Sequence, residues 1–204
     1  MIDPRSVLMD KLNVSHETFI HLQHYHDLLL KWQKNLNLIS PKTVNNVWDR
    51  HILDCAQICR FLPNKPCFIL DVGSGAGLPG VIISILTEHE VHLVEADHRK
   101  CAFLRTVLSR VHSKATVHEK RLEKMDNMKA DIITARAFAS IPKLLKLTEK
   151  QHHVDLRFFL LKGKDINSEL INVDSLQKLQ ITNKYASITS KSGCILELQF
   201  NGII

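Results

Sequence analysis

A short apolar segment that runs into closely spaced glycines is the feature that most constrains how this chain can fold. Residues 69–72 are apolar apart from Asp71, and glycines follow at positions 73, 75, 77 and 80. Glycine tolerates positive φ and, having no Cβ, lets a ligand approach the backbone closely. Pro79 suits the first turn of a helix. The sequence therefore predicts a strand, a tight turn and a helix, with a ligand at the carboxyl end of the strand.

Two classes of cofactor compete for this glycine loop. A frame that begins at Gly75 matches the dinucleotide pattern G-x-G-x-x-G, and Glu95 follows at a suitable distance. That frame, however, begins three residues beyond the strand, and a count from Gly73 places Leu78 at the third glycine position. An acid at Asp71 suits a cofactor whose methionine end carries an ammonium group. We therefore favour S-adenosylmethionine over NAD, and a tight turn that binds nothing is the structural alternative.

From residue 67 onward, short apolar runs alternate with amphipathic stretches. Strands are predicted at 67–72, 91–95, 115–118, 130–134 and 157–162, and helices at 79–88, 98–112 and 140–150. This alternation indicates a parallel sheet with right-handed crossovers. The segments 178–188 and 193–201 predict a terminal antiparallel pair. By fold analogy, a parallel sheet that ends in such a hairpin is the layout of Rossmann-like methyltransferases.

The first sixty residues show helical periodicity instead. Residues 16–36 and 43–62 carry apolar side chains at helical spacing, with Ser15 as the predicted N-cap of the first helix. Pro63 and Pro66 then end the helical region and lead into the first strand. We predict a helical cap at 1–62 and an α/β core at 63–204, which together form one compact unit.

Loops after the second and third predicted strands offer further cofactor contacts. Glu95 ends the second strand, where a carboxylate can accept hydrogen bonds from both ribose hydroxyls, and a salt bridge with Arg99 or Lys100 is the alternative. The triplet 121–123 follows the third strand, where a loop would flank an adenine. On chemistry alone this triplet would also pass for a solvated turn.

The segment after the fourth predicted strand would face a methyl acceptor. It reads Thr134 to Ser140 and contains neither an Asp/Asn-Pro-Pro-aromatic motif nor a Pro-Cys nucleophile, and the Pro66-Cys67 pair opens the first strand instead. Guanine N7 already presents a lone pair, so alignment and desolvation suffice for attack on a methyl group. Arg136 suits a carboxylate or phosphate and Phe138 suits stacking, although Arg136 could be purely structural.

Composition bears on the partner and the cellular location to be expected. The 27 basic and 21 acidic residues give a net charge of +6, which weakly favours a polyanionic partner. The five cysteines form no C-x-x-C motif, and neither a signal peptide nor a run of eighteen apolar residues is present. We therefore expect reduced thiols, a cytoplasmic location and no membrane association. The clustered histidines at 21, 24 and 26 have no suitably spaced third ligand, so we predict surface histidines and no metal site.

Taken together, the motifs resemble the ribosomal RNA small subunit methyltransferase G family, also called glucose-inhibited division protein B. The resemblance rests on six segments in the family's order: 35–40 (NLNLIS), 50–54 (RHILD), 71–80 (DVGSGAGLPG), 103–105 (FLR), 136–140 (RAFAS) and 161–163 (LKG). It implies a Rossmann-like class I fold with a mostly parallel seven-stranded sheet, and methylation of guanine N7 in bacterial 16S ribosomal RNA with S-adenosylmethionine.

The resemblance also implies site residues. With the residues argued above, the predicted cofactor set is Asp71, Gly73, Gly75, Leu78, Glu95, Leu122, Glu123 and Arg136, in which Arg136 also positions the reactants. Glu95 stands where many members carry aspartate. The candidate RNA contacts are Asn37, Arg50, His51, Arg121 and Lys162. Residues 165–190 match the family only loosely, so their role is open.

Other functions remain open on the sequence alone. A small-molecule methyltransferase would share the cofactor site but would need a lidded, mostly apolar pocket. A nicotinamide-dependent oxidoreductase and a non-catalytic RNA-binding module are further alternatives. The expected partner is 16S ribosomal RNA or the small ribosomal subunit. We expect a monomer, because no coiled coil or additional apolar stripe is evident.

Overall fold

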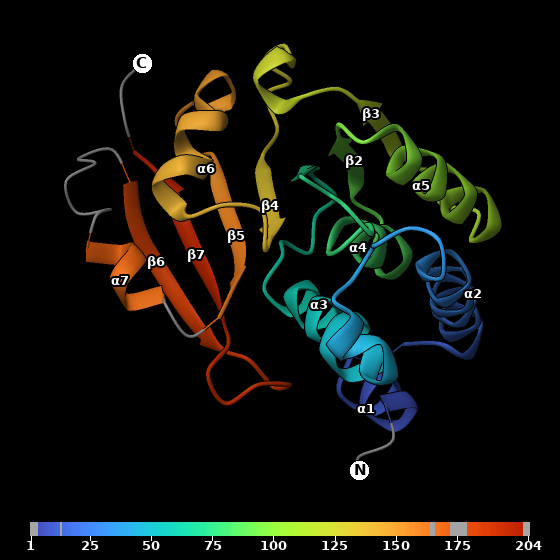
Figure 1. The fold of residues 1–204 in the computed structure, drawn as a ribbon. Helices are drawn as coiled ribbons and strands as arrows, with labels where there is room; N and C mark the ends of the chain where they lie inside the picture. The colour runs from blue at the N-terminus through green and yellow to red at the C-terminus, as the bar shows by residue number, and fades with distance from the viewer. Residues whose placement is uncertain (1–3, 13, 164–165, 172–178, 202–204) are drawn as a thin grey trace.

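The computed structural model describes residues 4–12, 14–163, 166–171 and 179–201, and within them one mixed sheet forms the centre of the molecule (Figure 1). Its strands, in spatial order, are β3 (Thr116–Glu119), β2 (Glu90–Glu95), β1 (Phe68–Val72), β4 (Ile132–Arg136), β5 (Arg157–Lys162), β7 (Cys194–Phe200) and β6 (Leu179–Ala186). Strands β1 to β5 pair in parallel, whereas β7 is antiparallel to both β5 and β6. The predicted Rossmann-like sheet with a terminal antiparallel hairpin is confirmed.

The first three helices between the strands lie close to their predicted positions, and the fourth, at 166–171, was not predicted. They are α4 (Gly80–Leu86), α5 (His98–Arg110), α6 (Ile141–Leu147) and α7 (Ile166–Ile171), with single 3₁₀ turns η4 (Leu122–Lys124) and η5 (Glu149–Gln151). Several boundaries differ by one or two residues, and one predicted helix is divided. The fourth strand begins two residues later than predicted, and the predicted helix 140–150 divides into α6 and η5 around Thr148, whose hydroxyl donates to the Leu144 carbonyl at 3.0 Å. Residue 178 of the predicted strand 178–188 lies outside the described residues.

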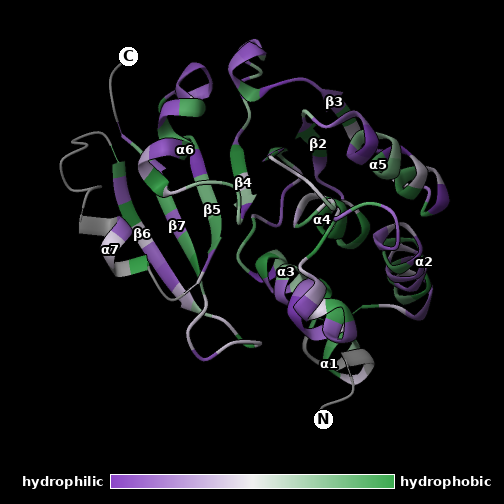
Figure 2. Ribbon diagram, viewed as in Figure 1, coloured by the Kyte–Doolittle hydropathy of each residue, from purple (hydrophilic) through white to green (hydrophobic). Residues whose placement is uncertain are grey.

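Side chains of successive strand residues enter two separate apolar cores, one on each face of the sheet. Ile69 belongs to the core beneath α2, α4 and α5, and its neighbour Leu70 belongs to the core beneath α6. In the same way Phe159 faces the first core and Phe158 the second. Strands buried on both faces read as continuous apolar runs, which explains the FILDV and RFFLL segments. Figure 2 shows these apolar residues along the central strands.

The N-terminal region packs onto one face of the sheet and shares its core. It comprises α1 (Pro4–Leu12), α2 (His16–Gln33), η1 (Pro41–Asn46), η2 (Trp48–Leu53), α3 (Asp54–Ala56) and η3 (Gln57–Arg60). Ser15 caps α2 as predicted, with its hydroxyl accepting from the Thr18 N–H at 3.1 Å. Leu22 and Leu29 are fully buried in the core that also contains Phe103 of α5. The division into a cap at 1–62 and a core at 63–204 stays a prediction.

One expectation for this region was wrong, and α1 was not predicted as a separate helix. The predicted single helix at 43–62 is a succession of 3₁₀, π and α turns, and the π turn Trp48–Leu53 contains Arg50 and His51. Changes of hydrogen-bonding pattern within a helical run reorient side chains locally and often occur at functional sites. Here they turn His51 inward, with only 7% of its surface exposed.

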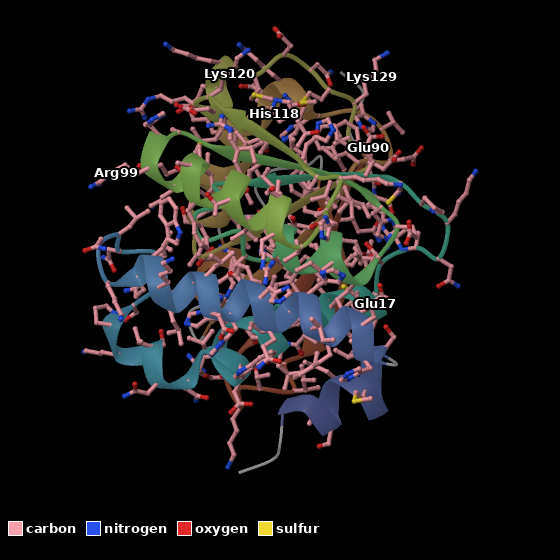
Figure 3. The ribbon with its side chains drawn as sticks, turned by 90° about the vertical axis from the view of Figure 1, so that its right-hand side faces the viewer. Glu17, Glu90, Arg99, His118, Lys120 and Lys129 are labelled. Atoms are coloured by element: carbon pink, nitrogen blue, oxygen red, sulfur yellow. The ribbon has the colours of Figure 1, made fainter. Side chains whose placement is uncertain are left out.

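Charged side chains lie on the outer surface of the molecule, on helices and on loops. The charged residues Glu17, Arg99 and Lys120 lie on the surface (Figure 3). His21 and His24, predicted as solvated, are instead half-buried between α2 and α5, where His24 Nε2 accepts from Arg110 at 3.2 Å. Across the described ranges, no helix is long and apolar enough to cross a membrane.

Candidate cofactor and acceptor site

The glycine loop adopts backbone conformations that only glycine takes without strain. Gly73, Gly75 and Gly77 have φ values of +65°, +55° and +83°. Close packing adds a second requirement at Gly73, where a Cβ atom would lie 2.0 Å from the ring of Phe138. At Gly75 the same atom would meet little more than the Gly73 carbonyl oxygen, at 3.7 Å. The loop therefore exposes backbone at Gly75 and brings Gly73 against the acceptor side.

Glu95 closes the cofactor side of the loop from the end of β2. Its Oε2 accepts from the Gly75 N–H at 2.9 Å, and its Oε1 accepts from the N–H groups of Ala96 and Asp97 at 2.7 and 2.8 Å. Neither Arg99 nor Lys100 forms an ion pair with Glu95 among the described residues, so the salt-bridge alternative is not what the structure shows. Three backbone donors hold the carboxylate in the position predicted for a ribose contact.

Asp71 lies beneath the loop rather than in the open. Its side chain is fully buried, and its Oδ1 accepts from the Thr134 hydroxyl at 2.8 Å. Burial raises the pKa of Asp71 to about 6, because a charged carboxylate is poorly solvated there, while the hydroxyls of Ser74 and Thr134 act in the opposite direction. This position joins β1 to β4 under the loop, and Asp71 does not line the cavity above it.

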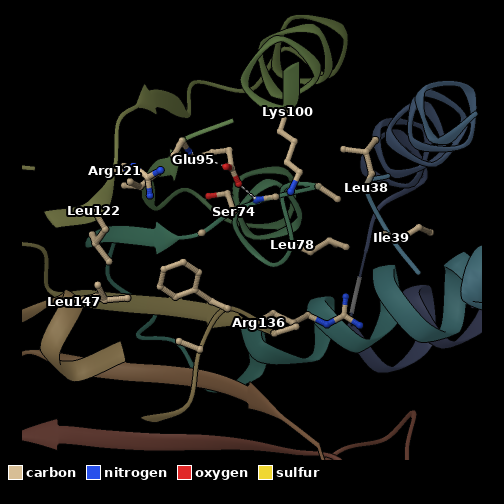
Figure 4. A pocket seen from close by; sticks show the side chains of 18 of the residues that line it. Leu38, Ile39, Ser74, Leu78, Glu95, Lys100, Arg121, Leu122, Arg136 and Leu147 are labelled. Carbon is tan, nitrogen blue, oxygen red and sulfur yellow. Dashed lines mark hydrogen bonds between the residues drawn. The ribbon is translucent and has the colours of Figure 1, made fainter. Parts of the chain in front are cut away.

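A cavity of about 650 Å³ opens at the carboxyl ends of β1, β2 and β4 (Figure 4). Backbone of the glycine loop forms its floor, and Glu95, Leu122 and Arg136 lie on its walls. Leu38, Ile39 and Ser40 contribute from the N-terminal region. The size falls in the range of about 300–1,000 Å³ that is common for cofactor sites. The wall combines two carboxylates, several cations and apolar patches, which suits a ligand with ammonium, ribose and adenine parts.

Arg136 is held at the end of β4 by groups from the N-terminal region. Its guanidinium donates to His51 Nδ1 at 2.9 Å and to the Arg50 carbonyl at 2.6 Å, and it lies 3.4 Å from Asp54 Oδ2. Arginine has no acceptor, so His51 Nδ1 must be unprotonated and the ring proton must sit on Nε2. Nε2 lies 2.8 Å from the Thr43 hydroxyl, which donates to the Ser40 carbonyl at 2.9 Å.

The environment keeps His51 neutral. Burial, together with the positive charges of Arg136 and Arg50, lowers the pKa of His51 to about 4. A protonated ring would lose the acceptor that receives Arg136 and would place a third positive charge in the same space. The direction of each hydrogen bond from Arg136 through His51 and Thr43 to Ser40 is therefore fixed by chemistry.

Asp54 links this arrangement to the terminal hairpin. Its Oδ1 accepts from the hydroxyls of Thr189 and Ser187 at 2.6 and 3.2 Å and from the amide of Gln57 at 3.0 Å. The Gln57 side-chain oxygen in turn accepts from the Ile188 N–H at 2.9 Å. The β6–β7 loop is thus fastened to the N-terminal region beside Arg136.

The structure brings most of the predicted site residues together. Those that line the cavity are Gly73, Gly75, Leu78, Glu95, Arg121, Leu122, Glu123, Arg136 and His51. Arg50 and Lys162 line an adjacent cavity, described below. Asn37 is exposed on the loop after α2 and lines neither cavity. The buried place of His51 favours a role in holding Arg136 over direct contact with RNA.

Sequence reasoning missed several residues that support the cavity. The hydroxyl of Tyr25, a fully buried residue of α2, donates to the Ala76 carbonyl at 2.9 Å and so ties the N-terminal region to the glycine loop. Tyr25 lies three residues after Leu22 and four before Leu29, so helical periodicity could have found it. Lys100 and Lys143 line the cavity from α5 and α6, and no local motif marks them.

Comparison with known proteins shows which family this chain belongs to. Residues 19–194 match the family described as rRNA small subunit methyltransferase G. The chain belongs to this family. A ribosomal RNA small subunit methyltransferase G from Paramagnetospirillum magneticum is 38% identical over 94% of this chain and 93% of its own. That of Orientia tsutsugamushi strain Ikeda is also 38% identical, over 92% of this chain and 93% of its own.

Solved structures support the fold class. The magnesium protoporphyrin IX methyltransferase from Synechocystis PCC 6803, solved with bound S-adenosylmethionine, superposes with a TM-score of 0.63 at 11% identity and covers 98% of both chains. At that identity the likeness concerns the fold alone. The family match therefore identifies the chain, and the structural match confirms the Rossmann-like methyltransferase architecture.

Proposed function

We propose that the protein transfers the methyl group of S-adenosylmethionine to N7 of a guanine in 16S ribosomal RNA. The observation that carries this proposal is family membership over most of the chain, combined with a cavity at the carboxyl ends of β1, β2 and β4 whose glycine loop and carboxylate suit that cofactor. An RNA substrate follows from the activity named for the family. The 16S molecule or the small subunit as partner, a cytoplasmic location and a monomeric state are parts of the same proposal.

The residues present fit the cofactor. The positive φ values of Gly73 and Gly75 leave a backbone cradle that side chains would fill. Glu95 is fixed by three N–H donors and retains one acceptor site, on Oε2, for a ribose hydroxyl. Leu122 is buried at the wall where an adenine ring would lie, with Glu123 beside it, and Leu78 lines the cavity from within the glycine loop.

Asp71 serves this site indirectly in our proposal. It is buried under the loop, joined to Thr134, and separated from the cavity. From there its hydrogen bond to Thr134 joins β4 to β1 beneath the loop that would meet the ammonium end of the cofactor, and Arg136 at the opposite wall is available to the cofactor carboxylate. Asp71 is therefore a positioning residue.

Bound S-adenosylmethionine supplies a sulfonium-activated methyl group, and the chain has to align an acceptor with it. Arg136 is fixed by His51, Arg50 and Asp54, so it holds position without costly reorganisation. The ring of Phe138 packs on Gly73 and is 37% exposed, which leaves a face available for stacking on a base.

This chemistry requires no general base. Guanine N7 carries an available lone pair, so no proton has to leave before methyl transfer. His51, the buried histidine nearest to Arg136, is committed at both nitrogens to Arg136 and Thr43. The site acts by alignment and exclusion of water.

Transfer of labelled methyl from S-adenosylmethionine to small ribosomal subunits that lack the modification would test the proposal, with nuclease mapping of the labelled nucleotide. Label at N7 of a guanine in 16S RNA is the expected result. Cofactor binding without transfer to RNA would favour a small-molecule methyltransferase. Thermal stabilisation by NAD but not by S-adenosylhomocysteine would favour an oxidoreductase, and binding of RNA without either cofactor would favour a non-catalytic module.

A further inference from the structure

A second cavity lies beside the cofactor cavity and is not required to hold the cofactor. It has a volume of about 430 Å³ and shares the segment 136–139 with the first cavity. Leu161 and Lys162 at the end of β5 and Cys194 at the start of β7 form part of its wall. A ligand in this space would meet a methyl group in the first cavity across the loop that carries Arg136 and Phe138.

A lysine and a glutamate form a fixed pair in this second cavity. Lys162 Nζ donates to Glu169 Oε2 at 2.8 Å and to the Ala139 carbonyl at 2.9 Å, and the two side chains are only 12% and 25% exposed. The Ile141 N–H also donates to Glu169 Oε2, at 2.9 Å. An ammonium group has three N–H donors, so Lys162 retains one.

Glu169 also retains hydrogen-bonding capacity. Both hydrogen bonds of its carboxylate involve Oε2, and Oε1 has no partner within the part of the chain that the structure describes. The pair therefore offers one N–H donor beside one charged acceptor, on two side chains that are mostly buried. The other carboxylate of this cavity, Asp54, is already occupied by Thr189, Ser187, Gln57 and Arg136.

A donor beside a charged acceptor complements one nucleobase edge. The Watson–Crick edge of guanine presents the O6 acceptor next to the N1–H and N2–H donors. Adenine presents an amino donor and a bare N1, which would place donor against donor at Lys162 and acceptor against acceptor at Glu169. Enzymes that modify bases commonly read this edge in a pocket. Reading it here leaves N7, on the far side of O6, unobstructed.

We propose that the second cavity receives the acceptor guanine and that Lys162 and Glu169 together read its Watson–Crick edge. This inference rests on the proposed function, because it names the subsite of the same methyl transfer. Lys162 donates to O6, and Glu169 Oε1 accepts from N1–H and N2–H. Phe138, at the boundary of the two cavities, lies where a ring can stack on the base.

A substrate analogue and a variant test the pair together. Once the methylated guanine has been mapped, small subunits are reconstituted with inosine at that position, which removes only the N2 amino group. We expect the wild-type kcat/KM for methyl transfer to fall about tenfold or more on inosine, as expected for loss of a hydrogen bond to a charged group. In Glu169→Gln we expect transfer to guanine to fall about 10- to 100-fold and the guanine-to-inosine ratio to approach one.

Matched measurements separate this subsite from folding and from the proposed function. Glu149→Gln makes the same change on an exposed surface and should leave both rates unaltered. S-adenosylhomocysteine affinity should be equal in all three proteins. Equal wild-type rates on guanine and inosine, or an unchanged ratio in Glu169→Gln, would overturn the subsite while leaving methylation of guanine intact. Failure of the wild type to methylate guanine with cofactor bound would overturn both. The wild-type inosine measurement stands even if the variant does not fold.

Discussion

The cofactor side and the acceptor side of this site are built in different ways. The cofactor side is a continuous stretch of chain, in which Gly73, Gly75 and Gly77 set the backbone and Glu95 closes it from the next strand. On the acceptor side, Arg136 receives its partners from residues about 85 positions earlier. The first side depends on local backbone conformation and the second on tertiary packing. Substitutions should therefore affect the two sides through different measurements.

Gly73→Ala should have the largest effect, because it breaks the contact between the two sides. A methyl group there would overlap the Phe138 ring at 2.0 Å on a backbone with φ of +65°. We expect S-adenosylhomocysteine affinity to fall at least about 100-fold, since left-handed backbone alone costs an alanine about 1–2 kcal/mol and the ring must also move. Calorimetric titration measures the affinity.

Two other glycines serve as controls for this prediction. Gly75→Ala imposes the same kind of backbone strain, but the nearest atom is 3.7 Å away, so a smaller loss of affinity is expected. Gly163→Ala meets nothing within 4 Å and should not change cofactor affinity. If Gly73→Ala and Gly75→Ala behaved alike, strain and not the Phe138 contact would explain the loss.

Arg136→Ala should have the next largest effect, on methyl transfer. Removal of the guanidinium eliminates hydrogen bonds to His51 and Arg50 and the ion pair with Asp54. We expect methyl transfer to fall about 10- to 100-fold, because hydrogen bonds of charged groups contribute about 1.5–3 kcal/mol. Turnover with subunits in excess measures the effect. Arg99→Ala, on the exposed face of α5, is the control, and turnover near that of the wild type in Arg136→Ala would remove this residue from the site.

The same contrast explains what could be predicted from sequence. The glycine loop and β5 were predicted within one residue of their observed bounds. Continuous apolar runs and closely spaced glycines determine the structure of their own segment, without help from distant residues. The boundary at β4 was two residues out, since an apolar run alone does not mark where pairing begins. The alternating helical turns at 41–60 follow from packing beneath Arg136, which no periodicity within that segment reveals.

The residues of the candidate site differ in the same way, because some could be named from local sequence and others are placed by tertiary packing. Gly73, Gly75, Glu95 and Leu122 could be named from their positions relative to predicted strands, and the structure places all four on the cavity. His51 was named as a candidate RNA contact from the resemblance, and the structure buries it beside Arg136. The pairing of Lys162 with Glu169 lay beyond prediction, since α7 falls in a region where the sequence resembles the family only loosely.

His51 lines the cofactor cavity and also holds Arg136. The pH dependence of the free energy of unfolding tests whether the folded protein keeps His51 neutral in that place. Its pKa of about 4 in the folded protein lies below the usual value of 6.5, so the unfolded chain binds the proton more readily. The stabilisation is present above pH 6.5 and is lost as the pH falls toward 4. Between pH 6.5 and 4.5 the wild type should lose about 2 kcal/mol of unfolding free energy that His51→Asn does not lose. Urea denaturation at each pH measures the difference.

Asp71 titrates in the same range with the opposite sign. Its pKa is raised to about 6, so its contribution is present at low pH and is lost as the pH rises from 3.8 through 6. Because both proteins retain Asp71, its effect cancels in the comparison of wild type with His51→Asn. Parallel stability curves for the two proteins would show that the folded protein does not hold His51 neutral.

Thr189→Val should have the smallest effect and should be confined to the acceptor side. It removes the 2.6 Å hydrogen bond to Asp54, while Ser187 and Gln57 still donate to the same oxygen. Since a single hydrogen bond contributes about 0.5–1.5 kcal/mol and two donors remain, we expect KM for subunits to rise about two- to fivefold. Thr182→Val, on β6 of the same hairpin, should leave KM unchanged. Cofactor affinity should be equal in all three proteins, because no contact of Thr189 reaches Glu95 or the glycine loop. A parallel loss of cofactor affinity in Thr189→Val would mean that the hairpin supports both sides, and the division between a local cofactor side and a packed acceptor side would fail.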